Sequence, residues 1–132
     1  MSVIAFDLDG TLEDSRRDMV AAVHRVRDMF ELEARADADI IGHVNRGMPH
    51  LYQVCFSELW SDGSQSEPLL DRVRLAYETD YSEHIADTTV PYPGIVSVLD
   101  DVRQMGTLAV VTNKPEDLSR RLLNALGLDV YF

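Results

Sequence analysis

The sequence predicts an α/β fold in which a parallel sheet is interrupted by an all-helical insertion. Three observations lead to this prediction. An apolar run at Val3–Phe6 ends at two aspartates, a second run at Thr107–Thr112 ends at a polar turn, and helical periodicity fills the segment between them. Strands that are apolar on both faces are typical of buried parallel sheets, and the ligand sites of such sheets lie just past the carboxyl ends of the strands.

The segment between the two runs, residues 15–87, is predicted to be helical. Its first helix is indicated by apolar residues that recur at helical spacing, Met19, Val23, Val26 and Phe30, after a capping box formed by Ser15 and Asp18. A short helix is expected at 39–44, and another begins at Pro49. A loop at 61–67 precedes a further helix marked by Leu70, Val73, Tyr77 and Ile85.

Beyond residue 88 the chain alternates between helix and strand. Pro93 and Gly94 open a helix, and its predicted buried face consists of Ile95, Leu99 and Val102. The last helix begins at Pro115, buries Leu118, Leu122 and Ala125, and ends at Gly127. This order of elements predicts a Rossmann-like core, residues 1–14 and 88–132, with a helical cap at 15–87. The core is incomplete within these residues.

Composition limits the class of protein. With 132 residues, 45% of them apolar, the chain has the size of one domain. Its formal charge of −11 argues against binding to nucleic acid or to an anionic membrane, but not against a small phosphorylated ligand. A single cysteine, Cys55, excludes an intrachain disulfide and fits a reducing compartment. No stretch is long and apolar enough to span a membrane, so we expect a cytoplasmic protein.

The residues that carry chemistry begin in the string VIAFDLDGTLEDS, residues 3–15. Two carboxylates one residue apart at a strand end allow one to attack a phosphorus atom while the other handles protons. An Asp-Gly pair alone is a common turn signal, but the longer string is far more specific. It resembles the phosphate-transferring branch of the haloacid dehalogenase-like hydrolases, whose hallmark is Asp-x-Asp-Gly-Thr.

The resemblance implies a role for each residue of this motif. Asp7 would attack the phosphorus and form an aspartyl-phosphate, while Asp9 would protonate the leaving oxygen and then deprotonate the attacking water. The Asp7 carboxylate and the Asp9 carbonyl would bind Mg²⁺. Backbone amides near Gly10 and Thr11 would hold the transferring oxygens. An acid at Asp9 favours a phosphatase or a phosphomutase over a dehalogenase.

A second motif, VVTNKP at 110–115, follows the second predicted strand. Its hydroxyl and amide groups, Thr112 and Asn113, are candidate phosphate ligands beside Asp7. Lys114 is either a further phosphate ligand or a solvated lysine at a helix start. The stretch resembles the phosphoglycolate phosphatase-like group, as does the Tyr-Pro-Gly sequence at 92–94. This resemblance implies a small phosphorylated metabolite as the substrate.

Other polar residues carry weaker signals. The four histidines, His24, His43, His50 and His84, lie in the helical insertion without metal-ligand spacing, so we interpret them as surface or structural residues. Arg46 is a candidate partner for a substrate carboxylate. Glu13 occupies a position where the family usually has an apolar residue.

Two further motifs of the family, a lysine and an acidic pair that completes the Mg²⁺ site, do not occur in these residues. Three explanations remain open: a truncated chain, a partner that supplies the missing strands, or a non-catalytic relative. We expect these 132 residues alone to be a poor catalyst and Val3–Phe6 to be an edge prone to self-association. The alternatives in function are a β-phosphoglucomutase-like phosphomutase and a non-catalytic phosphate-binding or interaction module.

Overall fold

The computed structural model describes residues 2–63 and 65–132, so Ser64 of the predicted loop lies outside the described residues. The chain divides into two compact units, which are described separately below. The strand unit comprises Met1–Ser15 and Ile85–Phe132, and the helical unit comprises Arg16–His84. Among the described residues, no helix has the length and apolar character needed to cross a membrane.

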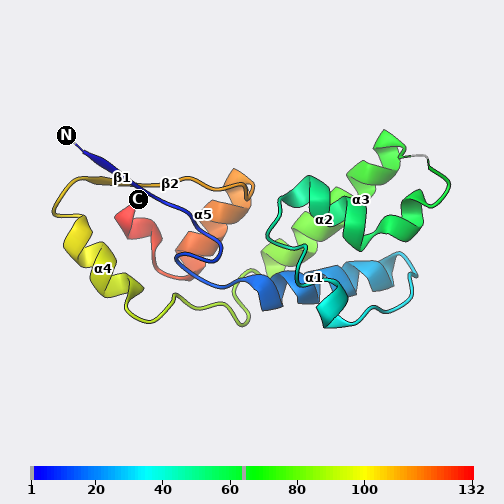
Figure 1. Cartoon of the computed structure of the whole chain (residues 1–132), viewed down its shortest axis with the longest axis horizontal. Coiled ribbons are helices and arrows are strands. Elements are labelled where there is room, and N and C mark those ends of the chain that lie inside the picture. Colours follow the sequence, from blue (N-terminus) through cyan, green and yellow to red (C-terminus); the bar gives the residue numbers. More distant parts are fainter. Residues whose placement is uncertain (1, 64) are drawn as a thin grey trace. The chain divides into compact units, whose positions relative to one another are not determined.

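The strand unit is built on two parallel strands, β1 (Val3–Phe6) and β2 (Thr107–Val110), which lie side by side (Figure 1). The register pairs Val3 with Thr107 and Phe6 with Val110. One more backbone hydrogen bond, 2.8 Å from the Val111 amide to the Phe6 carbonyl, continues the pairing past the strand ends. The predicted α/β class with parallel strands is therefore confirmed.

Two helices and a short 3₁₀ helix accompany the strands: α4 (Ile95–Val102), α5 (Glu116–Ala125) and η3 (Asp129–Tyr131). Gly94 precedes α4 with φ 86°, a conformation that favours glycine. Gly127 follows α5 with φ 71°, and the Leu128 amide returns to the Leu123 carbonyl at 2.9 Å. This geometry satisfies a free carbonyl at the helix end and confirms the predicted stop at Gly127.

The strand unit is more exposed than the sequence predicts. Val3 and Val111 are each 67% exposed, and Leu108 is the one residue of the strands that is buried. The predicted buried faces of the helices need correction as well, since α4 buries only Leu99 and Ala125 of α5 is exposed. A sheet of two strands has two open edges and little area to cover, so these apolar side chains find few partners.

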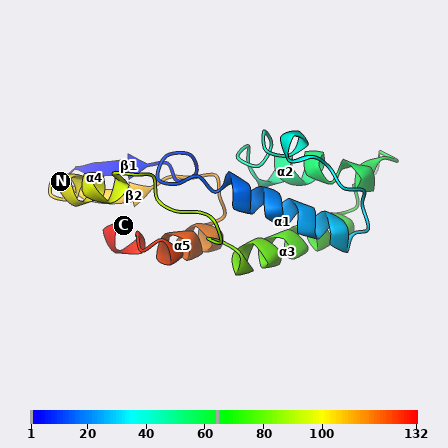
Figure 2. The same ribbon diagram turned by 90° about the horizontal axis from the view of Figure 1, so that it is seen from below.

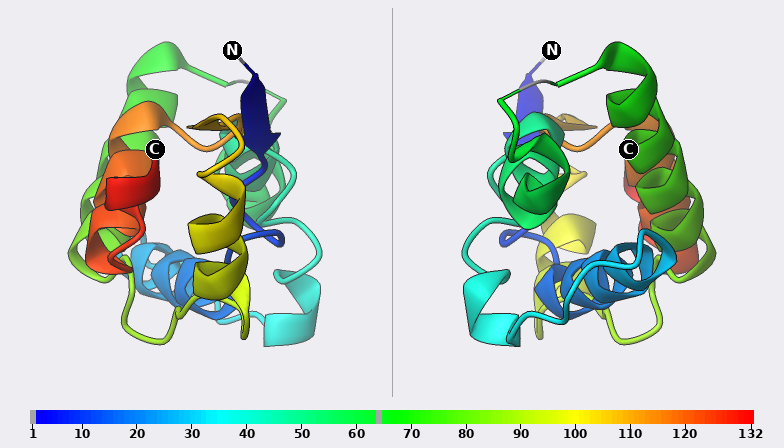
Figure 3. Two further views of the ribbon diagram at one scale, coloured as in Figure 1. Left: turned by 90° about the vertical axis from the view of Figure 1, so that its left-hand side faces the viewer. Right: turned by 90° about the vertical axis from the view of Figure 1, so that its right-hand side faces the viewer.

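The helical unit contains α1 (Arg16–Met29), α2 (Met48–Cys55) and α3 (Glu67–Glu83), with short 3₁₀ helices η1 (Asp37–Asp39) and η2 (Ser57–Trp60). α1 packs along α3, and α2 contacts both α3 and η2 (Figure 2). The three helices can also be followed in Figure 3, where α1 is blue, α2 blue-green and α3 green.

The short helix predicted at 39–44 is wrong. Most of those residues form hydrogen-bonded turns after η1. The Ile40 amide donates to the Asp37 carbonyl at 3.0 Å, and the His43 amide donates to the Ile40 carbonyl at 2.9 Å. Such i to i+3 bonds close tight turns, and the four-residue spacing of an α-helix is not sustained. Glycines at 42 and 47 shorten the segment that could be helical.

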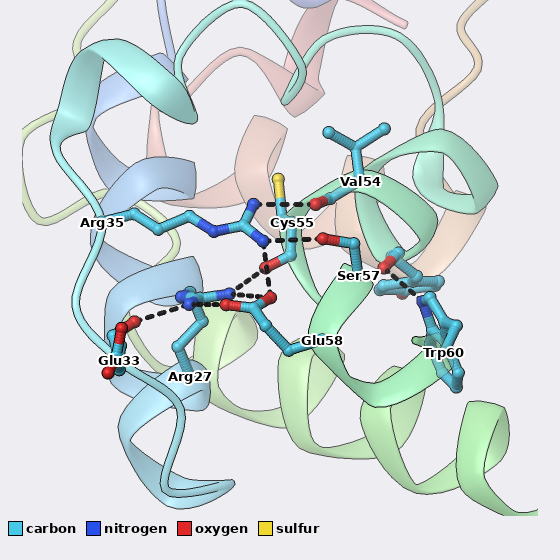
Figure 4. A network of polar contacts seen from close by, with 9 residues as sticks. Arg27, Glu33, Arg35, Val54, Cys55, Ser57, Glu58 and Trp60 are labelled. Carbon is cyan, nitrogen blue, oxygen red and sulfur yellow. Dashed lines mark hydrogen bonds and ion pairs between the residues drawn. The ribbon is translucent and has the colours of Figure 1, made fainter. Parts of the chain in front are cut away.

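The helical unit buries an arginine in addition to its apolar core. Arg27 is 1% exposed, and its guanidinium donates to the carbonyls of Cys55 and Glu33 and to the Glu58 carboxylate (Figure 4). Arg35 binds the same carboxylate. The paired arginines hold the pKa of Glu58 at about 2. This network joins the end of α1, the loop after it and the end of α2.

Candidate functional site

The polar residues of the first motif lie in a tight turn directly after β1. Asp7 is exposed, and its Oδ1 accepts the Leu8 amide at 2.8 Å, whereas the Leu8 side chain is completely buried. Gly10 has φ 82° and donates its amide to the Glu13 carbonyl at 2.7 Å. A buried leucine between two aspartates anchors the turn, so that Asp7 is held at the surface.

The second motif lies at the corresponding end of β2. Because Phe6 is paired with Val110, Asp7 and Thr112 both follow the strand pair at the same edge of the sheet. Thr112 is half-buried, and its Oγ1 accepts the Lys114 amide at 3.1 Å. Asn113 is exposed. The register thus places both motifs past the same end of the strand pair, and the predicted contact between Thr112 and Asp7 stays a prediction.

Asp9 is the centre of a buried polar cluster. Its Oδ1 accepts the Ser15 hydroxyl at 2.8 Å and lies 3.0 Å from the Nζ atom of Lys114. The side chain of Lys114 is 1% exposed and that of Asp9 is 15% exposed. Burial opposes ionisation of Asp9, but hydrogen bonding from Glu13 and the charge of Lys114 outweigh it and lower the pKa of Asp9.

Glu13 completes this cluster. Its side chain is fully buried, and neither carboxyl oxygen accepts a hydrogen bond from the described residues. Burial, together with the neighbouring Asp9 carboxylate, raises the pKa of Glu13 to about 9. Glu13 is therefore a neutral acid at pH 7. In that form it can donate a hydrogen bond to Asp9, which a second carboxylate could not do.

Sequence reasoning anticipated some of this arrangement and missed the rest. Lys114 is neither solvated nor at the surface, because it is paired with Asp9 inside the unit. The Ser15 hydroxyl donates to Asp9, a contact that the capping-box pattern does not indicate, and the predicted cap at Ser15 stays a prediction. The burial of Glu13 was not anticipated, and its signal was an acid at an apolar position of the motif. Together these groups form a charged cluster that can orient and hydrogen-bond one carboxylate.

In the helical unit, two of the four histidines come together although the sequence indicated no pairing. The Nδ1 atom of His43 lies 2.9 Å from the Nε2 atom of His50. Burial, followed by the positive charges of Arg46 and His43, lowers the pKa of His50. The described part of the chain contains no group of three or more His, Cys, Asp or Glu side chains that could hold a metal ion. The expected structural role of these histidines stays a prediction.

In the strand unit, two carboxylates follow the first strand and a hydroxyl follows the second, and such groups suit nucleophilic and acid–base chemistry. The family model described as "haloacid dehalogenase-like hydrolase" matches residues 4–132 of this chain. The chain therefore belongs to the haloacid dehalogenase-like hydrolases.

Relatives of this chain include proteins named phosphoglycolate phosphatases. The chain is 36% identical to a phosphoglycolate phosphatase of Caulobacter vibrioides over 99% of its own length and 55% of that protein. It is 32% identical to a phosphoglycolate phosphatase of Aquifex aeolicus, of which it covers 58%. The chain thus spans a little over half the length of the curated relatives that it matches.

Solved structures agree with the sequence comparison. A crystal structure described as a predicted phosphoglycolate phosphatase of Haemophilus somnus superimposes with a TM-score of 0.84 at 26% identity. The alignment covers 98% of this chain and 59% of that one. A hydrolase of the same family from Streptococcus pneumoniae, 20% identical, shares the fold with a TM-score of 0.76, 100% coverage of this chain and 59% of its own.

Proposed function

We propose that the protein to which this chain belongs hydrolyses the phosphate ester of a small metabolite through an aspartyl-phosphate at Asp7. The observation that carries the proposal is the exposed carboxylate of Asp7 at the carboxyl end of β1, next to the hydrogen-bonded carboxylate of Asp9. An exposed carboxylate can reach a phosphorus atom, and a second one nearby can manage protons. Because its relatives are named phosphoglycolate phosphatases, phosphoglycolate is the first substrate to assay.

The reaction assigns a task to each part of the site. Asp7 supplies the attacking oxygen, and Asp9 protonates the leaving oxygen and later accepts a proton from the hydrolytic water. Gly10 and Thr11 offer backbone amides, and Thr112 and Asn113 offer side-chain donors, to the oxygens of the transferred phosphoryl group. The lowered pKa of Asp9 keeps its carboxylate ionised, which is the state that accepts a proton from the hydrolytic water, and it also makes that carboxylate a weaker base.

The same residues fit an oxygen-bound cation such as Mg²⁺ in part. Asp7 has an exposed carboxylate, whereas the Asp9 carboxylate is engaged by Lys114 and Ser15, so Asp9 would contribute its backbone carbonyl. Mg²⁺ would neutralise charge on the phosphate ester. The described residues contain no group of three or more His, Cys, Asp or Glu side chains that could hold a metal ion, so within them water would complete the coordination of Mg²⁺.

Two measurements test this proposal. Asp7→Asn should lower phosphatase turnover at least about 10³-fold, because the nucleophile is lost. Beryllofluoride, a phosphoryl analogue, should bind to the unsubstituted protein and not to Asp7→Asn, as followed by ¹⁹F NMR. Since Asp7 is exposed, the variant should unfold at the same temperature as the parent. Full turnover by Asp7→Asn would refute the mechanism.

Asp9→Asn provides the second comparison. It should allow attack by Asp7 more readily than it allows hydrolysis of the intermediate, so phosphoenzyme should accumulate and be detected by intact mass. Equal loss of both steps would contradict the assignment of Asp9 to the hydrolytic water. Transfer of phosphate to a second sugar hydroxyl, in place of release to water, would identify a phosphomutase. Binding of beryllofluoride without any turnover would indicate a non-catalytic module.

A further inference from the structure

Lys114 differs in its surroundings from a lysine that binds an incoming phosphate. Its Nζ atom lies 3.0 Å from Asp9 Oδ1, and its side chain is 1% exposed. By contrast, the preceding residue, Asn113, is exposed. An ammonium that is buried against a carboxylate would have to give up that partner, at a substantial cost, before it could bind a ligand.

The backbone of Lys114 is fixed on both sides. Its amide donates to Thr112 Oγ1 at 3.1 Å, and its carbonyl accepts the Ser119 hydroxyl at 3.3 Å. Ser119 also donates to the Pro115 carbonyl at 2.9 Å, which ties the turn to the first turn of α5. The lysine stem therefore starts from a rigid point, and the ammonium at its end is held in one place.

The cluster also restricts Asp9. The Ser15 hydroxyl and the Lys114 ammonium both approach the same oxygen, Oδ1. Ser15 is held beyond the turn that follows β1, and Lys114 lies beyond the end of β2, so the two donors come from segments about a hundred residues apart in the sequence. Two donors from separate segments define the orientation of a carboxylate far better than one.

We propose that Lys114 is a positioning residue, which together with Ser15 holds the Asp9 carboxylate in its working orientation and does not bind the substrate phosphate. This proposal rests on the proposed function, because it assumes that Asp9 handles protons in the reaction. Its test, however, can be separated from turnover, since Lys114 is the only lysine of the sequence. Within these 132 residues, acylation of the peptide that contains Lys114 therefore reports on this side chain alone.

The experiment measures the acylation rate of Lys114 with an N-hydroxysuccinimide ester, by peptide mass spectrometry. In the unsubstituted protein the rate should be slow, and saturating phosphate or beryllofluoride should leave it unchanged. Asp9→Asn removes the paired charge and should raise the rate at least about tenfold, equivalent to ~1.4 kcal/mol. Asp7→Asn, the matched control, removes the neighbouring exposed carboxylate and should not raise it.

Unfolding would also expose Lys114, so folding is measured on the same samples. Amide hydrogen exchange of the β1–β2 peptides reports on the strand unit, and the buried thiol of Cys55 reports on the helical unit. If Asp9→Asn unfolds, Asp9→Glu is used instead, because it keeps the charge but moves the oxygen. Protection of Lys114 by phosphate, or equal acylation of the protein with and without the Asp9 carboxylate, would overturn the proposal.

Kinetics distinguish a positioning role from binding and from mere packing. Lys114→Met keeps the apolar stem, and it should lower kcat about 10- to 100-fold while KM stays within about twofold. Lys114→Arg retains the charge and should recover part of the lost kcat. A rise in KM with unchanged kcat would identify a phosphate ligand instead. These kinetic measurements need the full-length protein to which the chain belongs. If that protein has no turnover, the proposed function fails, and the acylation comparison still decides whether Lys114 is held against Asp9.

Discussion

Tyr77 and Tyr81 of the helical unit are completely buried, whereas Val3 and Val111 of the strand unit are each 67% exposed. The buried charges of the two units also differ. In the helical unit, Arg27 is bound by two backbone carbonyls and one carboxylate, which are structural partners. In the strand unit, the buried Lys114 meets Asp9. The buried Arg27 therefore stabilises the helical unit, whereas the buried Lys114 of the strand unit, by our proposal, positions a carboxylate that takes part in the reaction.

The largest effect should come from removing the buried arginine of the helical unit. Arg27→Met leaves two carbonyls without their donor and the Glu58 carboxylate with Arg35 alone, so we expect a loss of about 3 kcal/mol in the free energy of unfolding. Urea titration followed by the fluorescence of Trp60, the only tryptophan, measures this loss. Arg74→Met, which breaks an exposed pair with Asp71, should cost less than about 0.5 kcal/mol. Similar losses in both variants would contradict this prediction.

The two units should respond to pH in opposite directions. The pKa of Glu13 is raised from 4.5 to about 9, so the folded strand unit keeps a proton that the unfolded chain releases. Its stability should fall as the pH rises between these values. The pKa of Glu58 is lowered from 4.5 to about 2, so its contribution is present above pH 4.5 and is lost as the pH falls toward 2.

Amide exchange, corrected for intrinsic rates, can follow each unit separately. Glu13→Gln should remove the alkaline loss and make the strand unit at least about 1.4 kcal/mol more stable at pH 8, the value of one pKa unit. Glu58→Gln should remove the acidic loss of the helical unit. An identical pH profile in the two units would show that these carboxyls do not govern the difference.

The smallest effect concerns a helix end. Gly127 has φ 71°, so Gly127→Ala should destabilise the strand unit by about 1 kcal/mol. Gly42 of the helical unit has no positive φ, and a Cβ there would meet nothing within 4 Å. Gly42→Ala should therefore change stability by less than about 0.5 kcal/mol. Thermal unfolding of both variants is sufficient, and a larger loss at Gly42 would reverse the expected order.

Local patterns predicted the fold well where each pattern had one interpretation. The apolar runs became β1 and β2, Pro115 preceded α5, and Gly127 ended it. Helical periodicity predicted the buried faces of helices less well, because burial also depends on which other elements pack against the helix. Ala125 shares a helical face with Leu122 in the sequence, yet Leu122 is buried whereas Ala125, the last residue of α5, is exposed. Self-association through the edge of β1 stays a prediction, and sedimentation of the purified chain would test it.

The sequence predicted which residues belong to the candidate site, but not which of them contact one another. Asp7, Asp9 and Thr112 follow from motif and strand order, because parallel strands bring their carboxyl ends to one edge. No local pattern indicates that Lys114 extends inward to Asp9 or that Ser15 donates to the same oxygen. Those contacts join segments that are distant in sequence, and single-sequence reasoning has no signal for such pairings. The sequence shows an acid, Glu13, at a position where the family usually has an apolar residue. Only the structure shows the burial that raises the pKa of Glu13.

The register of the sheet has a consequence for synthesis on the ribosome. Val3 pairs with Thr107, whereas the helices of the helical unit lie within one continuous segment, Arg16–His84. At translation rates of about 5–20 residues per second, β2 emerges roughly 5–20 s after β1. The helical unit, with its short-range contacts, has time to fold during this interval. The first strand therefore leaves the ribosome tunnel long before its partner, and a chaperone that shields short apolar segments would find Val3–Phe6 accessible until β2 arrives.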